Sequence, residues 1–224
     1  LSDVSVNEDE SYSDTLRATD EEGDAITYSA SSDTSAVTAS ITDSILTLTP
    51  NANWHGMANI KAYASDGYSK DSTSFKLTGT PVNEAPTAFE WVSSALDTIN
   101  ITQSNLADTY TLQWDASTDV DGDSINYLVY AKIGVYPAEE VFDTTSTSVQ
   151  ITYQELVENV FEPFPMLPRV TVKFTVVATD GIDTVNVTGD DRVVFVNRYE
   201  YLSTEGEGVP VEFALHENYP NPFN

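Results

Sequence analysis

Residues 58–67 read Ala-Asn-Ile-Lys-Ala-Tyr-Ala-Ser-Asp-Gly, and this stretch decides the class of fold. Apolar and polar side chains alternate along it up to Ala64, which is the period of a half-buried β-strand. The Asp-Gly pair then predicts a turn. Short alternating segments separated by Gly, Asp, Asn and Pro recur around it, at residues 12–19, 25–30, 36–42, 45–49 and 73–80. This spacing predicts an antiparallel sandwich of immunoglobulin-like shape.

Two prolines interrupt the strand series in Pro81-Val-Asn-Glu-Ala-Pro86 and place a domain boundary near Glu84. A second series follows, at residues 109–114, 125–133, 141–144, 148–151, 170–179 and 192–196. Within it, Thr152-Tyr-Gln-Glu155 has the spacing of a capping box and predicts one short helix. We therefore expect an all-β chain of two tandem immunoglobulin-like sandwiches, residues 1–85 and 86–198. Residues 199–224 are expected to be a linker and the start of a further segment.

The chain has 224 residues, of which 36 are acidic and only 9 are basic, so its formal net charge is −27. Such a surface repels phosphates, so neither nucleic acid nor anionic lipid is an expected partner. Self-repulsion of this size also favours the binding of cations. Cysteine is absent, which excludes disulfides, thiolate catalysis and cysteine metal sites. No stretch approaches the roughly 20 apolar residues that span a bilayer, so membrane insertion is not expected.

Catalytic patterns are weak. The two histidines, His55 and His216, lie in separate turns or tails, which argues against a Ser-His-Asp arrangement or a histidine metal cluster. Pairs of carboxylates, which could hydrolyse glycosides, are expected by chance in a chain with so many acidic residues. The sequence therefore indicates a protein that is not an enzyme.

A short repeat links the two predicted domains. Residues 18–28, Ala-Thr-Asp-Glu-Glu-Gly-Asp-Ala-Ile-Thr-Tyr, parallel residues 116–127, Ala-Ser-Thr-Asp-Val-Asp-Gly-Asp-Ser-Ile-Asn-Tyr. Residues 64–67 and 178–181 likewise share an Asp-Gly turn after an alanine strand end. Two related sandwiches in tandem explain this pattern better than one large fold.

On these motifs, with Val6-Asn-Glu-Asp9 and Thr49-Pro-Asn-Ala-Asn-Trp-His-Gly56, residues 1 to about 85 resemble a bacterial cadherin-like repeat. Residues 86 to about 197 more loosely resemble a fibronectin type III-like sandwich. That likeness rests on residues 112–123 and on Lys173-Phe-Thr-Val-Val-Ala-Thr-Asp-Gly181. Phe174 stands where many such domains carry a corner tyrosine.

The end of the chain carries a separate signal. Leu215-His-Glu-Asn-Tyr-Pro-Asn-Pro-Phe-Asn224 closely resembles the opening of the C-terminal sorting domain of type IX secretion substrates from Bacteroidetes-related bacteria. The resemblance implies a protein secreted by, or held on the cell surface of, a Gram-negative bacterium. The strands of such a domain would follow Asn224.

The cadherin-like resemblance implies calcium (Ca2+) bound by acidic residues of the loops. Carried over by motif, one group of ligands is Glu8, Asp20, Glu22 and Asp66. A second group is Asn83, Glu84, Asp119, Asp121, Asp123 and Asp180. The alternative is that these aspartates cap turns. Asp119-Val-Asp-Gly-Asp123 is not an EF-hand loop, because Tyr130 stands where that loop needs a bidentate Glu.

We therefore expect a structural or adhesive segment of a larger secreted protein. Its expected partners are neighbouring domains of the same polypeptide, and surface glycans or another protein. The alternative is an accessory carbohydrate-binding module of a secreted enzyme, with an aromatic platform drawn from Trp54, Trp91, Tyr136 and Phe164. Against that platform stands the interpretation that Trp54 and Trp114 cover the sandwich cores.

Overall fold

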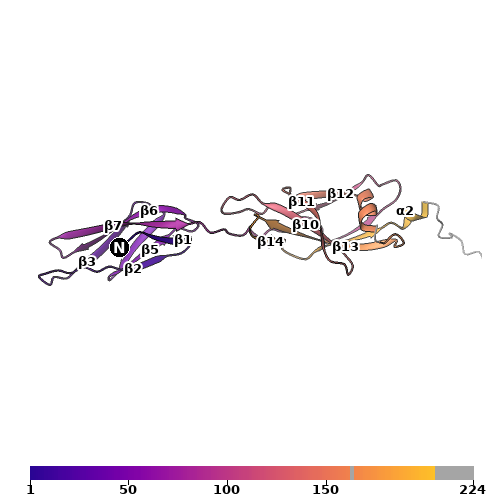
Figure 1. The fold of residues 1–224 in the computed structure, drawn as a ribbon. Helices are drawn as coiled ribbons and strands as arrows, with labels where there is room; N and C mark the ends of the chain where they lie inside the picture. The colour runs from indigo at the N-terminus through magenta and orange to yellow at the C-terminus, as the bar shows by residue number, and fades with distance from the viewer. Residues whose placement is uncertain (162–163, 205–224) are drawn as a thin grey trace, which may run out of the picture. The chain divides into compact units, whose positions relative to one another are not determined.

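The computed structural model describes residues 1–161 and 164–204 (Figure 1). The chain divides into two compact units, Leu1–Glu84 and Ala85–Asn224, here called unit 1 and unit 2. Each unit has a hydrophobic core of its own.

Unit 1 is a sandwich of two sheets. One sheet has the strand order β1 (Val4–Asn7), β7 (Lys70–Thr80), β6 (Gly56–Ser65) and β3 (Thr27–Ser32). The other has the order β2 (Tyr12–Thr15), β5 (Ile45–Pro50) and β4 (Val37–Thr42). Alternation along the strands sends one row of side chains inward, and the fully buried ones include Leu46, Leu48, Ile60 and Leu77. All pairs are antiparallel except β1 with β7, which is parallel.

Unit 2 is built around a larger sheet. Its strand order is β11 (Glu139–Thr144), β10 (Asn126–Ile133), β13 (Arg169–Thr179), β15 (Arg192–Asn197) and β8 (Leu96–Asn100), with β14 (Thr184–Asn186) paired to β13. A two-stranded sheet of β9 (Thr109–Gln113) and β12 (Ser148–Thr152) faces the same core. Trp114, Val129, Val172 and Val176 are among its fully buried side chains. Both units are thus immunoglobulin-like β-sandwiches, which confirms the predicted fold class.

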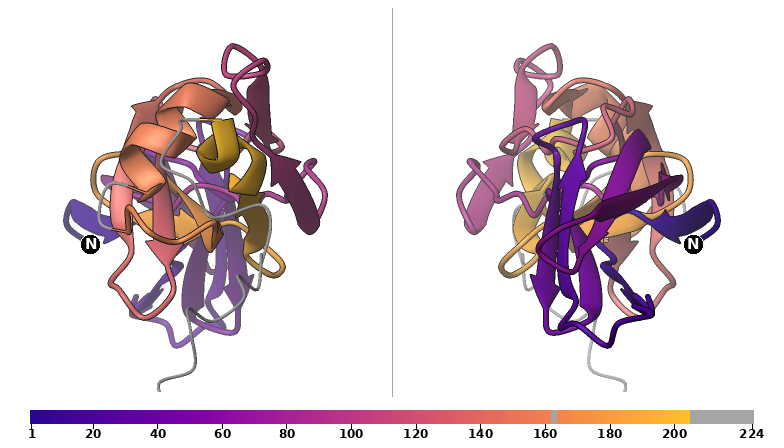
Figure 2. Two further views of the ribbon diagram at one scale, coloured as in Figure 1. Left: turned by 90° about the vertical axis from the view of Figure 1, so that its right-hand side faces the viewer. Right: turned by 90° about the vertical axis from the view of Figure 1, so that its left-hand side faces the viewer.

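The predicted helix follows β12. It consists of α1 (Tyr153–Glu155) and a π-helical turn, η1 (Leu156–Val160), which Figure 2 shows in orange. The Thr152 hydroxyl accepts the Glu155 N–H at 3.1 Å, and the Glu155 carboxylate accepts the Thr152 N–H at 2.8 Å. This is the reciprocal pair of a capping box, as predicted. A second short helix, α2 (Tyr199–Thr204), follows β15.

The large aromatic side chains mostly serve the cores. Trp91 is 8% exposed and meets Trp114 edge to face at 6.1 Å. Trp54 packs against the core of unit 1. The aromatic platform proposed for sugars is therefore wrong for these two tryptophans, while Tyr136 and Phe164 contact each other edge to face at 5.3 Å.

No helix within residues 1–161 and 164–204 is long and apolar enough to cross a membrane. The sorting-domain resemblance falls on residues 215–224, which lie outside the described residues.

Candidate metal centre

The repeated acidic loops occupy the same place in each unit. In unit 1 the loop of residues 20–24 leads into β3, where Tyr28 pairs with Ala64 of β6. In unit 2 the loop of residues 119–123 leads into β10, where Tyr127 pairs with Ala178 of β13. The Asp-Gly turn follows β6 in the first case and β13 in the second. Within each unit, the acidic loop and the Asp-Gly turn therefore lie at the same end of one sheet.

A tyrosine hydroxyl closes each acidic loop. The Tyr28 hydroxyl accepts the N–H of Ala18 at 3.0 Å, and the Tyr127 hydroxyl accepts the N–H of Ser117 at 2.8 Å. Each bond joins residues that are ten positions apart. The tyrosine at the end of the sequence repeat thus has the same structural role in both units.

The first aspartate of each loop binds the backbone of its own loop. Asp20 Oδ1 accepts the N–H of Asp24 at 2.8 Å. Asp119 Oδ1 accepts the N–H of Asp121 at 2.8 Å and that of Asp123 at 3.3 Å. In both loops a glycine with positive φ makes the turn, at 84° and 86° respectively. The turn-capping role proposed as the alternative is therefore present for Asp20 and Asp119.

The aspartates of the two Asp-Gly turns are also bound alike. Asp66 Oδ1 accepts the N–H groups of Tyr68 at 2.7 Å and Ser69 at 2.6 Å. Asp180 Oδ1 accepts those of Ile182 and Asp183, both at 2.7 Å. The Ser69 and Tyr68 amides hold the pKa of Asp66 below its usual value. Each turn thus binds its aspartate carboxylate through two backbone N–H groups, at the same end of the sheet as the acidic loop.

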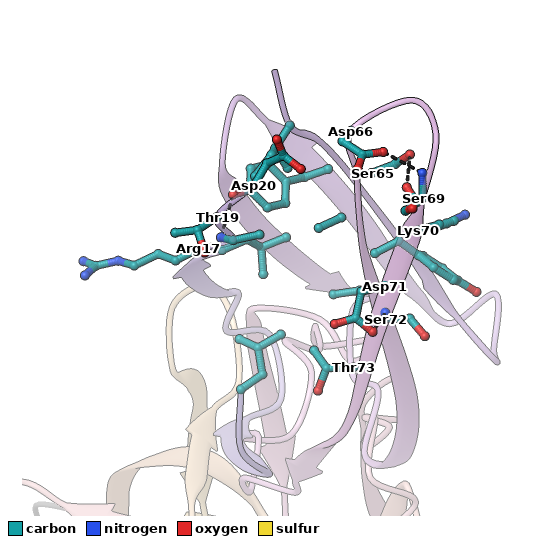
Figure 3. A pocket seen from close by; sticks show the side chains of 18 of the residues that line it. Arg17, Thr19, Asp20, Ser65, Asp66, Ser69, Lys70, Asp71, Ser72 and Thr73 are labelled. Carbon is teal, nitrogen blue, oxygen red and sulfur yellow. Dashed lines mark hydrogen bonds between the residues drawn. The ribbon is translucent and has the colours of Figure 1, made fainter. Parts of the chain in front are cut away.

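In unit 1 these groups border a cavity of about 690 Å3. Figure 3 shows Asp20 and Asp66 at one end of it, with Asp71 and Thr73 of β7 along the wall. The ammonium of Lys70 lies 3.8 Å from the centre of the Tyr63 ring, also at the wall. Asp20 and Asp66 are therefore brought together, as the sequence motif implied.

Glu8 is the most buried carboxylate among the predicted ligands, with an exposed fraction of 4%. Its N–H donates to Thr80 at 2.9 Å, and its Oε1 accepts the N–H of Val82 at 2.6 Å. Its Oε2 is buried and has no hydrogen-bond partner among the described residues. The nearest cationic group is His55, whose Nδ1 lies 3.7 Å away and is charged only when protonated. A buried anionic oxygen of this kind is costly unless a cation faces it.

The structure separates Glu8 from Asp20 and Asp66, so their grouping into one site is wrong. Glu8 is bonded to Thr80, the last residue of β7, because β1 runs parallel to the end of that strand. Asp66 precedes Lys70, the first residue of β7. Ten residues of extended strand separate these ends by roughly 33 Å. Glu22 is exposed in the acidic loop, and within the described residues it forms no hydrogen bond or ion pair with Glu8, Asp20 or Asp66.

Asn83 and Glu84, two predicted ligands of the second group, follow the end of β7 in unit 1. Asn83 and Glu84 are half-buried, and the Asn83 amide donates to the Glu84 carbonyl at 3.3 Å. A carboxylate oxygen of Glu84 lies within 4.8 Å of one from Glu8. A single cation can contact oxygens at this separation, since calcium binds each ligand at 2.3–2.6 Å. Unit 1 thus pairs Glu8 with Glu84 rather than with the acidic loop.

In unit 2 the corresponding feature is Asp119. Its Oδ2 is buried and lacks a hydrogen-bond partner among the described residues, while its Oδ1 is fully used by the loop. Asp121 and Asp123 are exposed beside it. The sequence pattern found these carboxylates but not the role of three neighbouring groups: His55 lies beside Glu8, and the Tyr28 and Tyr127 hydroxyls each accept an N–H at the start of an acidic loop. The position of each tyrosine at the end of the repeat is the signal that could have found the last two.

A family model described as a bacterial Ig domain matches residues 2–78. No curated protein matches the chain. Solved structures that are similar to it include an endo-fucoidan hydrolase of glycoside hydrolase family 107, with 18% identity and a TM-score of 0.32. That match covers 88% of this chain and 27% of the hydrolase, so the chain spans about a quarter of the hydrolase's length.

Two further solved structures give comparable matches. Titin domains Z1Z2 in complex with telethonin match at 14% identity and a TM-score of 0.35, over 88% of this chain and 92% of that one. Drosophila N-cadherin EC1-4 matches at 11% identity and a TM-score of 0.40, over 82% of this chain and 43% of that one. These values are too low to carry an argument about function. The structure shows two immunoglobulin-like sandwiches, and residues 2–78, within the first of them, match the bacterial Ig domain model.

Proposed function

We propose that this chain is a non-enzymatic structural segment of a larger exported protein, and that it binds calcium at Glu8 and Glu84 in unit 1 and at the acidic loop of residues 119–123 in unit 2. The bacterial Ig match and the immunoglobulin-like fold of both units fit a structural domain of a larger protein. A sandwich with a closed core keeps its two ends at a fixed separation. Such a unit suits a spacer or stalk that presents neighbouring domains of the same polypeptide.

One observation carries the calcium proposal. Glu8 Oε2 in unit 1 and Asp119 Oδ2 in unit 2 are buried carboxylate oxygens without a hydrogen-bond partner among the described residues. Most buried polar atoms in proteins are paired, so an exception calls for a water or an ion. Calcium takes six to eight hard oxygens from carboxylates, carbonyls and water. The surrounding groups are of this kind, since Glu84 accompanies Glu8 and two exposed aspartates follow Asp119.

The affinity is expected in the range of extracellular modules, with a Kd of about 10⁻⁴–10⁻³ M, because few protein ligands are pre-arranged. A ligand that binds only the folded state stabilises it by about 1.4 kcal/mol at roughly ten times its Kd. Magnesium should stabilise less, because it demands stricter octahedral geometry and gives up its waters reluctantly.

Calorimetry of the whole chain in chelator, in calcium and in magnesium tests this. Calcium is expected to raise the thermal midpoint, and Glu8→Gln and Asp119→Asn should each remove part of the increase. Both substitutions keep the oxygen that binds the backbone, at Val82 and in the acidic loop. Asp43→Asn, in a turn of unit 1 with positive φ that asparagine tolerates, is the matched control. An equal thermal midpoint in chelator and in calcium would contradict calcium binding and leave the acidic residues with a structural role only.

The location outside the cell is supported by the sorting-domain resemblance of Leu215 to Asn224. Deletion of the native gene from Leu215 onward is expected to retain the protein inside the cell envelope while both sandwiches stay folded. Cell fractionation with a folded-state probe, such as resistance to proteolysis, measures both. Normal export of the deleted protein would remove this support for a secreted or surface location.

A further inference from the structure

The exposed cationic residues of unit 2 lie on the outward face of its large sheet. Along β13, inward residues are buried and outward residues alternate with them, which places Arg169, Thr171 and Lys173 on the outer face. On β10, Lys132 pairs directly with Lys173. Lys132, Arg169 and Lys173 are all exposed. A chain with four times as many acidic as basic residues thus places three cations on one face of one sheet.

The remaining two cations of unit 2 are already engaged. Arg192 lies over the Trp91 ring at 4.9 Å. Arg198 is 6% exposed and donates to the carbonyls of Phe164, Pro165 and Leu167. No ion pair involves Lys132, Arg169 or Lys173 within residues 1–161 and 164–204. The exposed cations of unit 2 therefore have charge to offer a ligand.

Of the carboxylates near this face, one points inward and the others lie on the edge strand β11, where Glu140 is diagonal to Lys132. Asp97 of β8 faces inward, where it accepts the Tyr110 hydroxyl at 2.9 Å. On the far strand, Asp143 accepts the Asn126 amide, and Glu140 pairs with Tyr130. The outward positions of β8, β15 and β13 carry no acidic residue. Positive charge thus dominates the half of the face that β13 shares with β15 and β8.

An exposed aromatic ring lies beside these cations. Phe195 of β15 is 42% exposed and pairs with Thr171 on β13 and Thr98 on β8. The neighbouring outward pair, Asn197 and Asn100, is joined by an amide hydrogen bond of 2.9 Å. Because Thr171 lies between Arg169 and Lys173, the ring has a cation at each diagonal position, roughly 7–8 Å away between Cα atoms.

A hollow of about 430 Å3 opens over this part of the sheet. Phe195, Thr98, Thr171, Asn100, Asn197 and Arg169 line it. Its volume falls in the range of small-ligand sites, roughly 300–1,000 Å3. An exposed ring offers a surface for the apolar face of a sugar, while amides, hydroxyls and a guanidinium bind hydroxyl and acid groups.

We propose that this face binds an acidic polysaccharide, through carboxylate or sulfate groups on Lys132, Lys173 and Arg169 and a sugar ring on Phe195. The direct pairing of Lys132 with Lys173 is unfavourable on its own, and an anion between the two ammonium groups removes that cost. The net charge of −27 repels any polyanion. It repels duplex DNA, which carries a charge about every 1.7 Å, more strongly than it repels a polysaccharide with one acid group per sugar. A hollow can enclose a sugar ring, whereas a bilayer surface is contacted more readily by a protruding face.

The proposed ligand of the structural segment is thus an acidic polysaccharide. This rests on the proposed function in one respect only, the location of the protein outside the cell. The experiment uses the whole chain in chelator at about 50 mM salt, so calcium has no part in it. Binding to alginate, dextran sulfate and neutral dextran is measured by affinity electrophoresis. The expected result is retardation by alginate or dextran sulfate, none by dextran, and weakening as salt is raised to about 200 mM.

Three variants assign the binding to the face. Lys132→Gln with Lys173→Gln is expected to weaken binding about tenfold, and Phe195→Ala severalfold at unchanged charge. Lys61→Gln with Lys76→Gln in unit 1 makes the same change of net charge and is expected to have little effect. The proposal is overturned if neither acidic polysaccharide binds, if the unit 1 pair weakens binding equally, or if only anionic phospholipid vesicles or DNA bind through these lysines. Failure here leaves the calcium-dependent midpoint, which tests the structural function, unaffected.

Discussion

At the level of single residues, the two acidic loops share the same tyrosine hydrogen bond, but this bond is exposed in unit 1 and buried in unit 2. The hydroxyl of Tyr28 serves the exposed N–H of Ala18, whereas that of Tyr127 serves the N–H of Ser117, a residue that is 7% exposed. The energetic importance of the same bond should therefore differ between the units, because water can replace only the exposed one.

Tyr127→Phe is expected to destabilise unit 2 by about 1–2 kcal/mol, since it leaves a buried N–H without a partner. Tyr28→Phe should change the stability of unit 1 by no more than about 0.5 kcal/mol. Denaturant unfolding of the two variants, with the wild-type chain as reference, measures both. Equal effects would show that burial does not decide the strength of this bond.

Asp66 gives a pH dependence. Its folded pKa lies below the usual value, mainly because the Ser69 and Tyr68 amides bind the ionised form. Its contribution to stability is therefore fully present above the unfolded pKa of about 3.9 and is lost as pH falls through the folded pKa. Asp66→Asn should lower the thermal midpoint at neutral pH, and the difference from wild type should shrink below about pH 4. A difference that is constant down to about pH 2.5 would contradict this assignment.

At the scale of elements, the packing of β7 against the turn before β6 depends on a missing side chain. A Cβ at Gly79 would lie 2.9 Å from both a ring carbon and the carbonyl oxygen of Trp54. Gly79→Ala is therefore expected to destabilise unit 1 by about 1–3 kcal/mol through overpacking. Thermal unfolding measures this, and Ser74→Ala on the exposed side of β7 is the control. A midpoint within error of the wild type would mean that Trp54 moves aside without cost.

The alternating strands and the capping box could be predicted from the sequence because each is a local pattern. β8 was missed because only Ile99 of its five residues is a buried hydrophobic side chain, and β14 because it has three residues. Strand β2 ends at Thr15, earlier than the pattern predicts. The strands that enclose the cores were thus more predictable than the edges.

The grouping of the candidate ligands could not be predicted in the same way. Motif order placed Glu8 with Asp20 and Asp66, but the parallel pairing of β1 with the end of β7 carries Glu8 to the other end of the sheet. Whether an edge strand runs parallel or antiparallel depends on long-range pairing that local alternation does not encode. The sequence thus identified the candidate carboxylate ligands but not which of them lie close together.

For the whole molecule, each unit has its own buried core, and neither core shares a residue with the other. Leu48 in unit 1 and Leu112 in unit 2 are both fully buried. Leu48→Ala and Leu112→Ala are each expected to cost about 2–5 kcal/mol. In calorimetry, each should lower one transition by roughly 10 °C or more and leave the other in place. A shift of a single shared transition by either substitution would show that the units unfold together.

The hydrogen bonds of the two Asp-Gly turns also bear on how long the chain survives chemically intact. An Asp-Gly sequence ages when the glycine nitrogen attacks the aspartate carboxyl, closes a succinimide ring and reopens as isoaspartate. Here the Gly67 N–H is held by the Ser65 hydroxyl at 3.2 Å, and the Gly181 N–H by the Thr179 hydroxyl at 3.0 Å. The carboxylates that would be attacked are themselves held by amides further along each turn. The folded turns thus keep the glycine nitrogen and the aspartate carboxyl apart, which slows isoaspartate formation at both Asp-Gly bonds.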